Sequence, residues 1–154
     1  MTVSFAVDRL EKKLEIDYRD VEFWTVIRHP EKRLLSSVNY HYKQTRNFLP
    51  AHTNIDNYLD MVRNSRYWEG TVYRSQSSWL DRDDIDVRLW PLEHYDDMLR
   101  QLGWDQPLPQ ENKSPKTWTM DDLRLSKHYD VFMAKYDDDW RLYQKALDKF
   151  PESP

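Results

Sequence analysis

Hydrophobic residues in the first part of the chain recur at the three- and four-residue spacing of a helix. Thr2 suits the N-cap position, so the pattern predicts an amphipathic helix over residues 3–15. The segment Glu22–Ile27 is rich in β-branched and aromatic residues, which is typical of a strand. A second helix is expected over Pro30–Gln44, because a proline in the first helical turn loses no hydrogen bond. The apolar positions of the first helix are Val3, Val7, Leu10 and Leu14.

A helix, a strand and a further helix are predicted in the middle of the chain. Asn54 or Thr53 would cap the helix, whose apolar residues are Ile55, Tyr58, Leu59 and Val62. The segment Asp86–Trp90 begins as a strand and leads directly into the further helix. Gly103 is well placed to end that helix, because glycine readily adopts the left-handed conformation found there.

The last part of the chain is predicted to be a loop followed by helices. Residues 104–118 contain three prolines and form a loop of a length that is often functional. Thr119 and Asp122 then make an N-terminal capping pattern. Helical periodicity continues from there towards Phe150, with a break expected near Ser126.

Strands that lead directly into helices favour an α/β layered domain with a parallel sheet. Only two strands are clear, so we expect a small parallel sheet largely covered by helices. The length fits a single domain over residues 1–154. We expect this domain to comprise an N-terminal helix in residues 1–20 and a core in residues 21–150.

The composition argues against several classes of function. The chain has no cysteine and its five histidines lack metal-binding spacing, so no metal is expected. A net charge of −4 makes nucleic acid an unfavourable partner. We find neither a signal-peptide pattern nor a membrane-spanning run, and so expect a cytoplasmic protein with no membrane partner. The acidic segments DRDDIDVRLW and KYDDDW are expected to be a solvated turn and a charged helix face.

The segment VIRHPEKRLLSS has the residues of an anion site. An arginine at the carboxyl end of a parallel strand, directly before a helix, would add a permanently charged fork to the free N–H groups of the helix N-terminus. Arg28 has this position, and Arg33 and Ser36 follow one turn later. The alternative is that both arginines are ordinary surface residues of a strand-to-helix turn.

The same segment resembles the 3′-phosphate-binding motif of the sulfotransferase family, particularly its carbohydrate-type members. Arg28, Pro30, Arg33 and Ser36 match motif positions, whereas His29 stands where the family usually has Asp. Further segments resemble later family motifs in the family order, over about residues 20–145. These segments are SQSSWL, VRLWPLEHYDDMLRQLGW with Glu93 at the acidic position, PQENKSP, and YDDDWRLY.

The resemblance implies a P-loop-NTPase-like sulfotransferase fold and an adenosine nucleotide ligand. The implied ligands are 3′-phosphoadenosine 5′-phosphosulfate or adenosine 3′,5′-bisphosphate, with the 3′-phosphate held by Arg28 and Ser36. Arg33 is expected to pack and pair around the turn. Asn112 and Lys113 are expected to be further nucleotide contacts. His29 is the candidate general base for deprotonating an acceptor hydroxyl, and His41 is a second candidate.

The family's other signature, a lysine- and glycine-containing loop that cradles the 5′-phosphosulfate, has no counterpart before the motif. Residues 1–22 contain no glycine, and the two glycines of the chain lie downstream. We therefore expect a truncated domain, and the sequence leaves open whether it is an enzyme.

Three explanations of the missing loop remain. Another chain could supply the loop, or other basic residues could replace it, and either would leave an active sulfotransferase. Alternatively, catalysis has been lost and the chain is a nucleotide-binding module or acts through a protein partner or as a homo-oligomer. Short derivatives of metabolic folds are common in viruses, although nothing in the sequence identifies the source.

Overall fold

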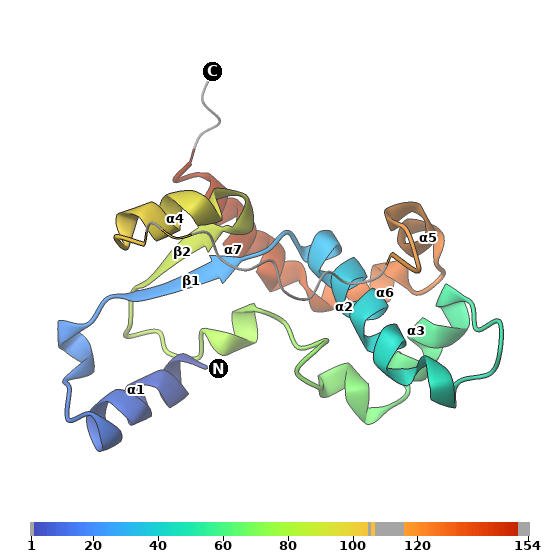
Figure 1. The fold of residues 1–154 in the computed structure, drawn as a ribbon, viewed down its shortest axis with the longest axis horizontal. Helices are drawn as coiled ribbons and strands as arrows, with labels where there is room; N and C mark the ends of the chain where they lie inside the picture. Colours follow the sequence, from blue (N-terminus) through green and yellow to red (C-terminus); the bar gives the residue numbers. More distant parts are fainter. Residues whose placement is uncertain (1, 105, 107–115, 151–154) are drawn as a thin grey trace. The chain divides into compact units, whose positions relative to one another are not determined.

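The computed structural model of the chain describes residues 2–104, 106 and 116–150 (Figure 1). Short 3-10 turns join its helices and strands. In chain order, the helices and strands are α1 (Val3–Lys13), β1 (Phe23–Ile27), α2 (Pro30–Thr45), α3 (Ile55–Arg63), β2 (Val87–Pro91), α4 (Tyr95–Gln101), α5 (Met120–Leu125), α6 (Tyr129–Lys135) and α7 (Asp137–Leu147).

The two strands form a parallel sheet in which Phe23 is opposite Val87 and Ile27 is opposite Pro91. The α/β class and the small parallel sheet that the sequence predicts are therefore confirmed. The predicted segments of both strands agree with the observed ones to within one residue at each end. Helix α2 begins at Pro30, as the proline signal indicates.

The chain divides into two compact units. The first comprises Met1–Arg28, Ser75–Trp104 and Asp138–Pro154, and the second comprises His29–Arg74 and Asp105–Asp137. The sheet belongs to the first unit, whereas helices α2, α3, α5 and α6 belong to the second. Each unit has an apolar cluster of its own, which is the physical basis of the division.

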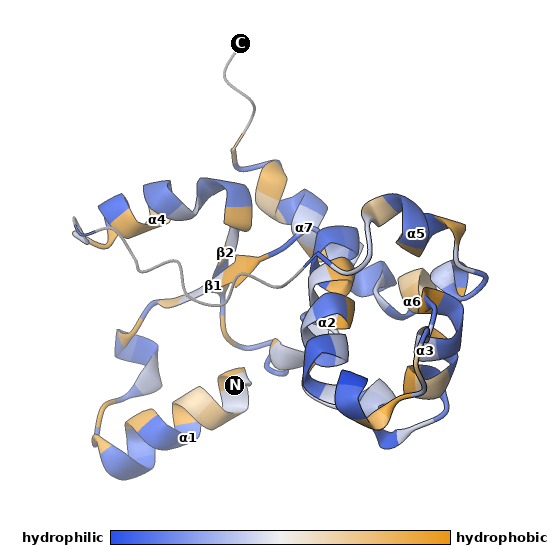
Figure 2. Cartoon of the chain, turned by 45° about the vertical axis from the view of Figure 1, so that its right-hand side comes forward, coloured by the Kyte–Doolittle hydropathy of each residue, from blue (hydrophilic) through white to orange (hydrophobic). Residues whose placement is uncertain are grey.

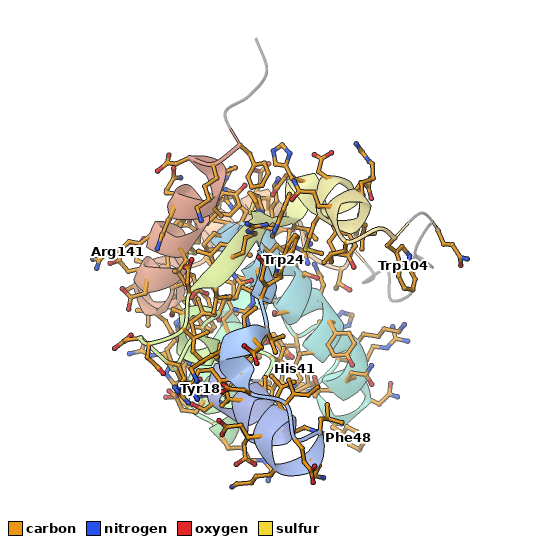
Figure 3. All side chains as sticks on the ribbon, turned by 90° about the vertical axis from the view of Figure 1, so that its left-hand side faces the viewer. Tyr18, Trp24, His41, Phe48, Trp104 and Arg141 are labelled. Carbon is orange, nitrogen blue, oxygen red and sulfur yellow. The ribbon has the colours of Figure 1, made fainter. Side chains whose placement is uncertain are left out.

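The first unit buries one face of its sheet against helix α7. Ile27 and Leu89 project from that face and pack with Tyr143 and Ala146 of α7. Successive strand residues point to opposite faces. The other face therefore bears Trp24, which is labelled in Figure 3. Its indole stacks on that of Trp90 with ring centroids 5.5 Å apart.

The second unit is a cluster of amphipathic helices around an aromatic core. Helices α2 and α3 carry both hydrophilic and hydrophobic residues (Figure 2), and their apolar residues face the interior. The core residues are Leu34, Val38, Tyr58, Leu59, Val62, Tyr73, Leu123, Phe132 and Tyr136, all 0% or 1% exposed.

Two buried polar side chains hold the second unit together. The carboxamide of Asn39 in α2 accepts the N–H groups of Thr117 and Trp118 and donates to the carbonyl of Trp118 at 3.0 Å. Glu31, at the start of α2, accepts hydrogen bonds from Arg124 and Tyr129. These contacts fix α2 against the segment that leads into α5 and against α5 and α6.

Helix ends follow the local signals in the sequence. Thr2 and Asn54 accept backbone N–H groups at the starts of α1 and α3. Thr119 and Asp122 form the complete reciprocal capping box at α5. Gly103, just after α4, has a φ of 72°, which favours glycine. The C-terminal helical region is divided more finely than its periodicity predicts, into α5, α6 and α7.

No helix among the described residues is long and apolar enough to cross a membrane.

Candidate functional site

The carboxyl end of β1 is held by a side chain from a distant segment. The backbone N–H of Arg28 donates to Gln76 Oε1 at 3.1 Å, and Gln76 Nε2 donates to the carbonyl of Arg28 at 3.0 Å. A residue in a strand normally presents its N–H and its C=O to a neighbouring strand in this way. The carboxamide of Gln76 thus takes the place of a strand partner for the residue that follows β1.

Gln76 is in turn held by Asp139, from α7. The two carboxylate oxygens of Asp139 accept the backbone N–H groups of Gln76 at 2.9 Å and Ser77 at 2.8 Å. Asp139 is completely buried and Gln76 is 6% exposed. Hydrogen bonds to a buried charged group contribute more than neutral ones, so this segment is strongly fixed. We call Arg28, Gln76 and Asp139 the strand-end clamp.

The role of Asp139 differs from the sequence prediction for KYDDDW. That segment is predicted to be a charged, solvated helix face, which is wrong for Asp139, since its carboxylate lies in the interior of the first unit. The resemblance of YDDDWRLY to a family segment is the signal in the sequence that could have drawn attention to Asp139. Asp138, beside it, forms an exposed ion pair with Arg141.

Arg33 is engaged by residues of the second unit. Its guanidinium donates to the carbonyl of Arg74 and lies over the ring of Tyr136, 5.6 Å from the centroid. Such contacts commit an arginine to packing as well as to charge. They support the structural role that the sequence interpretation gives to Arg33.

His29 and Ser36 lie at the start of α2. His29 is the N-cap residue, and its side chain makes no capping hydrogen bond. Its carbonyl accepts the N–H of Arg33 at 2.9 Å, so its backbone begins the helix. Ser36 lies in the second turn and is half-buried. Asn112 and Lys113, the other expected nucleotide contacts, lie outside the described residues.

The second candidate base, His41, lies in the aromatic core of the second unit. Its Nδ1 is 3.2 Å from the hydroxyl of Tyr73, and the ring of Tyr67 meets it edge-on at 4.4 Å. Burial lowers the pKa of His41, because the charged imidazolium would lose its hydration. This environment suits a packed neutral imidazole more than a general base that meets a substrate.

No group of three or more histidine, aspartate or glutamate side chains in the described part of the chain could hold a metal ion. Comparison of the chain with protein-family models, with curated proteins and with solved structures gives no match. The candidate site therefore depends on the geometry at the carboxyl end of β1 and on the residues of the motif.

Proposed function

We propose that this chain is a sulfotransferase-like protein that binds the 3′-phosphate of an adenosine nucleotide where β1 leads into α2. The observation that carries the proposal is the fixed carboxyl end of a parallel strand, which bears Arg28 two residues before a 16-residue helix begins. Ligands of α/β proteins usually bind beyond the carboxyl ends of the strands.

Two residues of the motif, Arg28 and Ser36, bind the phosphate in this proposal. Arg28 supplies a planar guanidinium that can donate two parallel hydrogen bonds to phosphate oxygens. Ser36 supplies a hydroxyl donor. The preferred ligand is adenosine 3′,5′-bisphosphate or 3′-phosphoadenosine 5′-phosphosulfate.

We further propose that the chain by itself binds the nucleotide without transferring sulfate. The residues before β1 fold into α1 and a short 3-10 turn at Tyr18–Asp20, and they include no glycine. Sulfuryl transfer needs donors aimed at the phosphate oxygen on which charge develops as it leaves, and such a donor contributes about 3 kcal/mol. A 3′-phosphate site lies at the far end of the donor from that oxygen.

A titration with adenosine 3′,5′-bisphosphate, read by calorimetry and by melting temperature, tests the binding. Ligand at about a hundred times its dissociation constant should stabilise the fold by about 2.7 kcal/mol. Adenosine 5′-monophosphate, which lacks the 3′-phosphate, should bind at least tenfold more weakly. Arg28→Ala should remove binding. Arg19→Ala should not, because Arg19 is exposed and paired with Asp17.

The absence of binding to wild-type protein at millimolar bisphosphate would overturn the nucleotide site.

Incubation with radiolabelled 3′-phosphoadenosine 5′-phosphosulfate and a panel of hydroxyl acceptors tests the second part of the proposal. Binding without transfer is expected. Transfer of label by the purified chain would instead restore the enzyme.

A further inference from the structure

We infer that Gln76 and Asp139 are positioning residues for Arg28, and that the strand-end clamp sets the affinity and selectivity of the site. The ligand in this inference is the one that the proposed function gives, so the inference rests on that proposal. The geometry comes from the hydrogen bonds of the clamp.

The first step is the match between the carboxamide of Gln76 and the backbone of Arg28. Gln76 offers one acceptor and one donor, and Arg28 offers one backbone donor and one backbone acceptor, so both pairs are complementary. Two hydrogen bonds to a single residue restrain its φ and ψ together. Because Arg28 follows the last residue of β1, these hydrogen bonds also fix the direction in which its side chain leaves the backbone.

The second step is the restraint on Gln76 itself. A long side chain loses rotamer freedom when it binds in one geometry, which costs up to about 2 kcal/mol. Asp139 offsets part of this cost, because it holds the backbone of Gln76 and Ser77 with two charge-assisted hydrogen bonds. The buried carboxylate therefore preorganises the carboxamide that holds Arg28.

The third step is the effect on a bound phosphate. A guanidinium binds phosphate best when its two N–H groups and two oxygens lie in one plane, and a preorganised fork loses less entropy on binding. A clamp that orients Arg28 should therefore affect the binding of the 3′-phosphate more than the binding of the rest of the nucleotide. The predicted signature is a loss of selectivity for the 3′-phosphate, not only a loss of stability.

The decisive variant is Gln76→Glu, which keeps the shape of the side chain but places a carboxylate oxygen against the carbonyl of Arg28. We expect the dissociation constant for adenosine 3′,5′-bisphosphate to rise at least tenfold. We also expect the ratio of the dissociation constants for adenosine 5′-monophosphate and adenosine 3′,5′-bisphosphate to approach one. The amide of Arg28 should exchange faster with deuterium. Asp139→Asn, which removes one of the charge-assisted acceptors, should change the same three quantities in the same direction by a smaller factor.

Two controls separate positioning from general destabilisation. Gln144→Glu makes the same chemical change at an exposed position of α7 and should leave all three quantities unchanged. Phe132→Ala removes a buried ring from the core of the second unit and should lower the melting temperature without changing the selectivity. All affinities are measured at a temperature where circular dichroism shows each variant folded.

The outcomes decide the inference and the proposed function separately. If wild-type protein binds the bisphosphate and Gln76→Glu binds it equally well with unchanged selectivity, the positioning role is wrong. If wild-type protein does not bind, the proposed function is wrong, and deuterium exchange at the Arg28 amide then decides the clamp alone. Unchanged exchange in both Gln76→Glu and Asp139→Asn would overturn it. Should Gln76→Glu fail to fold, Asp139→Asn provides the same comparison.

Discussion

The network at the start of α2 provides the most quantitative prediction from the structure. The side chain of Glu31 is 8% exposed and accepts hydrogen bonds from Arg124 Nε at 2.9 Å and Nη2 at 2.8 Å. The hydroxyl of Tyr129 donates to the same carboxylate. The hydrogen bond from Arg124 is the largest cause that lowers the pKa of Glu31, from 4.5 to about 2.

This shift can be converted into stability. At about 1.4 kcal/mol per pKa unit, the preference of the fold for ionised Glu31 is about 3 kcal/mol. Because the Arg124 side chain is 53% exposed, solvent screens the pair, and we expect about 2 kcal/mol. Glu31→Gln should therefore lower the free energy of unfolding by about 2 kcal/mol at neutral pH. For a chain of this size the melting temperature should fall by about 4–8 °C.

The dependence on pH follows from the direction of the shift. Because the folded-state pKa of Glu31 is below the unfolded value, its stabilisation is fully present above pH 4.5 and is lost as the pH falls from there towards about 2. The difference between wild-type protein and Glu31→Gln should therefore narrow by about 1 kcal/mol between pH 7 and about pH 3.5.

Urea unfolding followed by circular dichroism at the two pH values measures this difference. Glu11→Gln, at an exposed position of α1, is the matched control and should match wild-type protein at both pH values. A Glu31→Gln variant as stable as wild-type protein at neutral pH would refute the reasoning. So would a difference of the same size at both pH values.

Two further predictions concern the second unit. Phe132→Ala removes a fully buried ring that meets Trp68 edge-on at 4.8 Å, and should lower the free energy of unfolding by about 3–5 kcal/mol in urea titrations. A loss below 1 kcal/mol would show that this core is loosely packed. Asn39→Ala leaves the N–H groups of Thr117 and Trp118 without their side-chain acceptor and should cost about 1–3 kcal/mol. Faster deuterium exchange at these two amides should accompany the loss, and unchanged exchange would contradict the role of Asn39.

Local signals predict the elements of this fold well. The capping residues Thr2, Asn54 and Thr119 act within three residues of their own position, so the sequence alone contains the whole interaction. The strand at Phe23–Ile27 is equally evident, because its β-branched and aromatic residues favour an extended backbone. The parallel pairing follows from the strand–helix order, since parallel strands need a crossover connection.

The roles of polar residues are less evident from the sequence. Asp139 lies among three consecutive aspartates, and periodicity alone places it on a solvated face. Its burial depends on the backbone of Gln76, 63 residues away in sequence. Glu31 likewise depends on Arg124, at a separation of 93 residues. A buried charge is tolerated only where its partner is present, and the partner is a property of the fold.

The motif at Arg28–Ser36 contains both features that the local sequence predicts and contacts that depend on distant residues. The sequence predicts that β1 leads into a helix that begins at Pro30, because that depends on proline chemistry and on local propensity. It also suggests that Arg33 packs around the turn, and the carbonyl of Arg74 and the ring of Tyr136 supply the contacts. The hydrogen bonds between the side chain of Gln76 and the backbone of Arg28 have no local signature, since nothing in either segment identifies the other.

The strand-end clamp also has a consequence for the time course of folding during synthesis. Gln76 follows Arg28 by 48 residues, and Asp139 follows Gln76 by a further 63. At about 5–20 residues per second, a ribosome needs on the order of ten seconds to proceed from the first of these residues to the last. The strand-end clamp therefore cannot be complete on the ribosome until Asp139 of α7 has been made. Ligand binding that requires an oriented Arg28 is a property that the nascent chain acquires late, after the helices of the second unit have been synthesised.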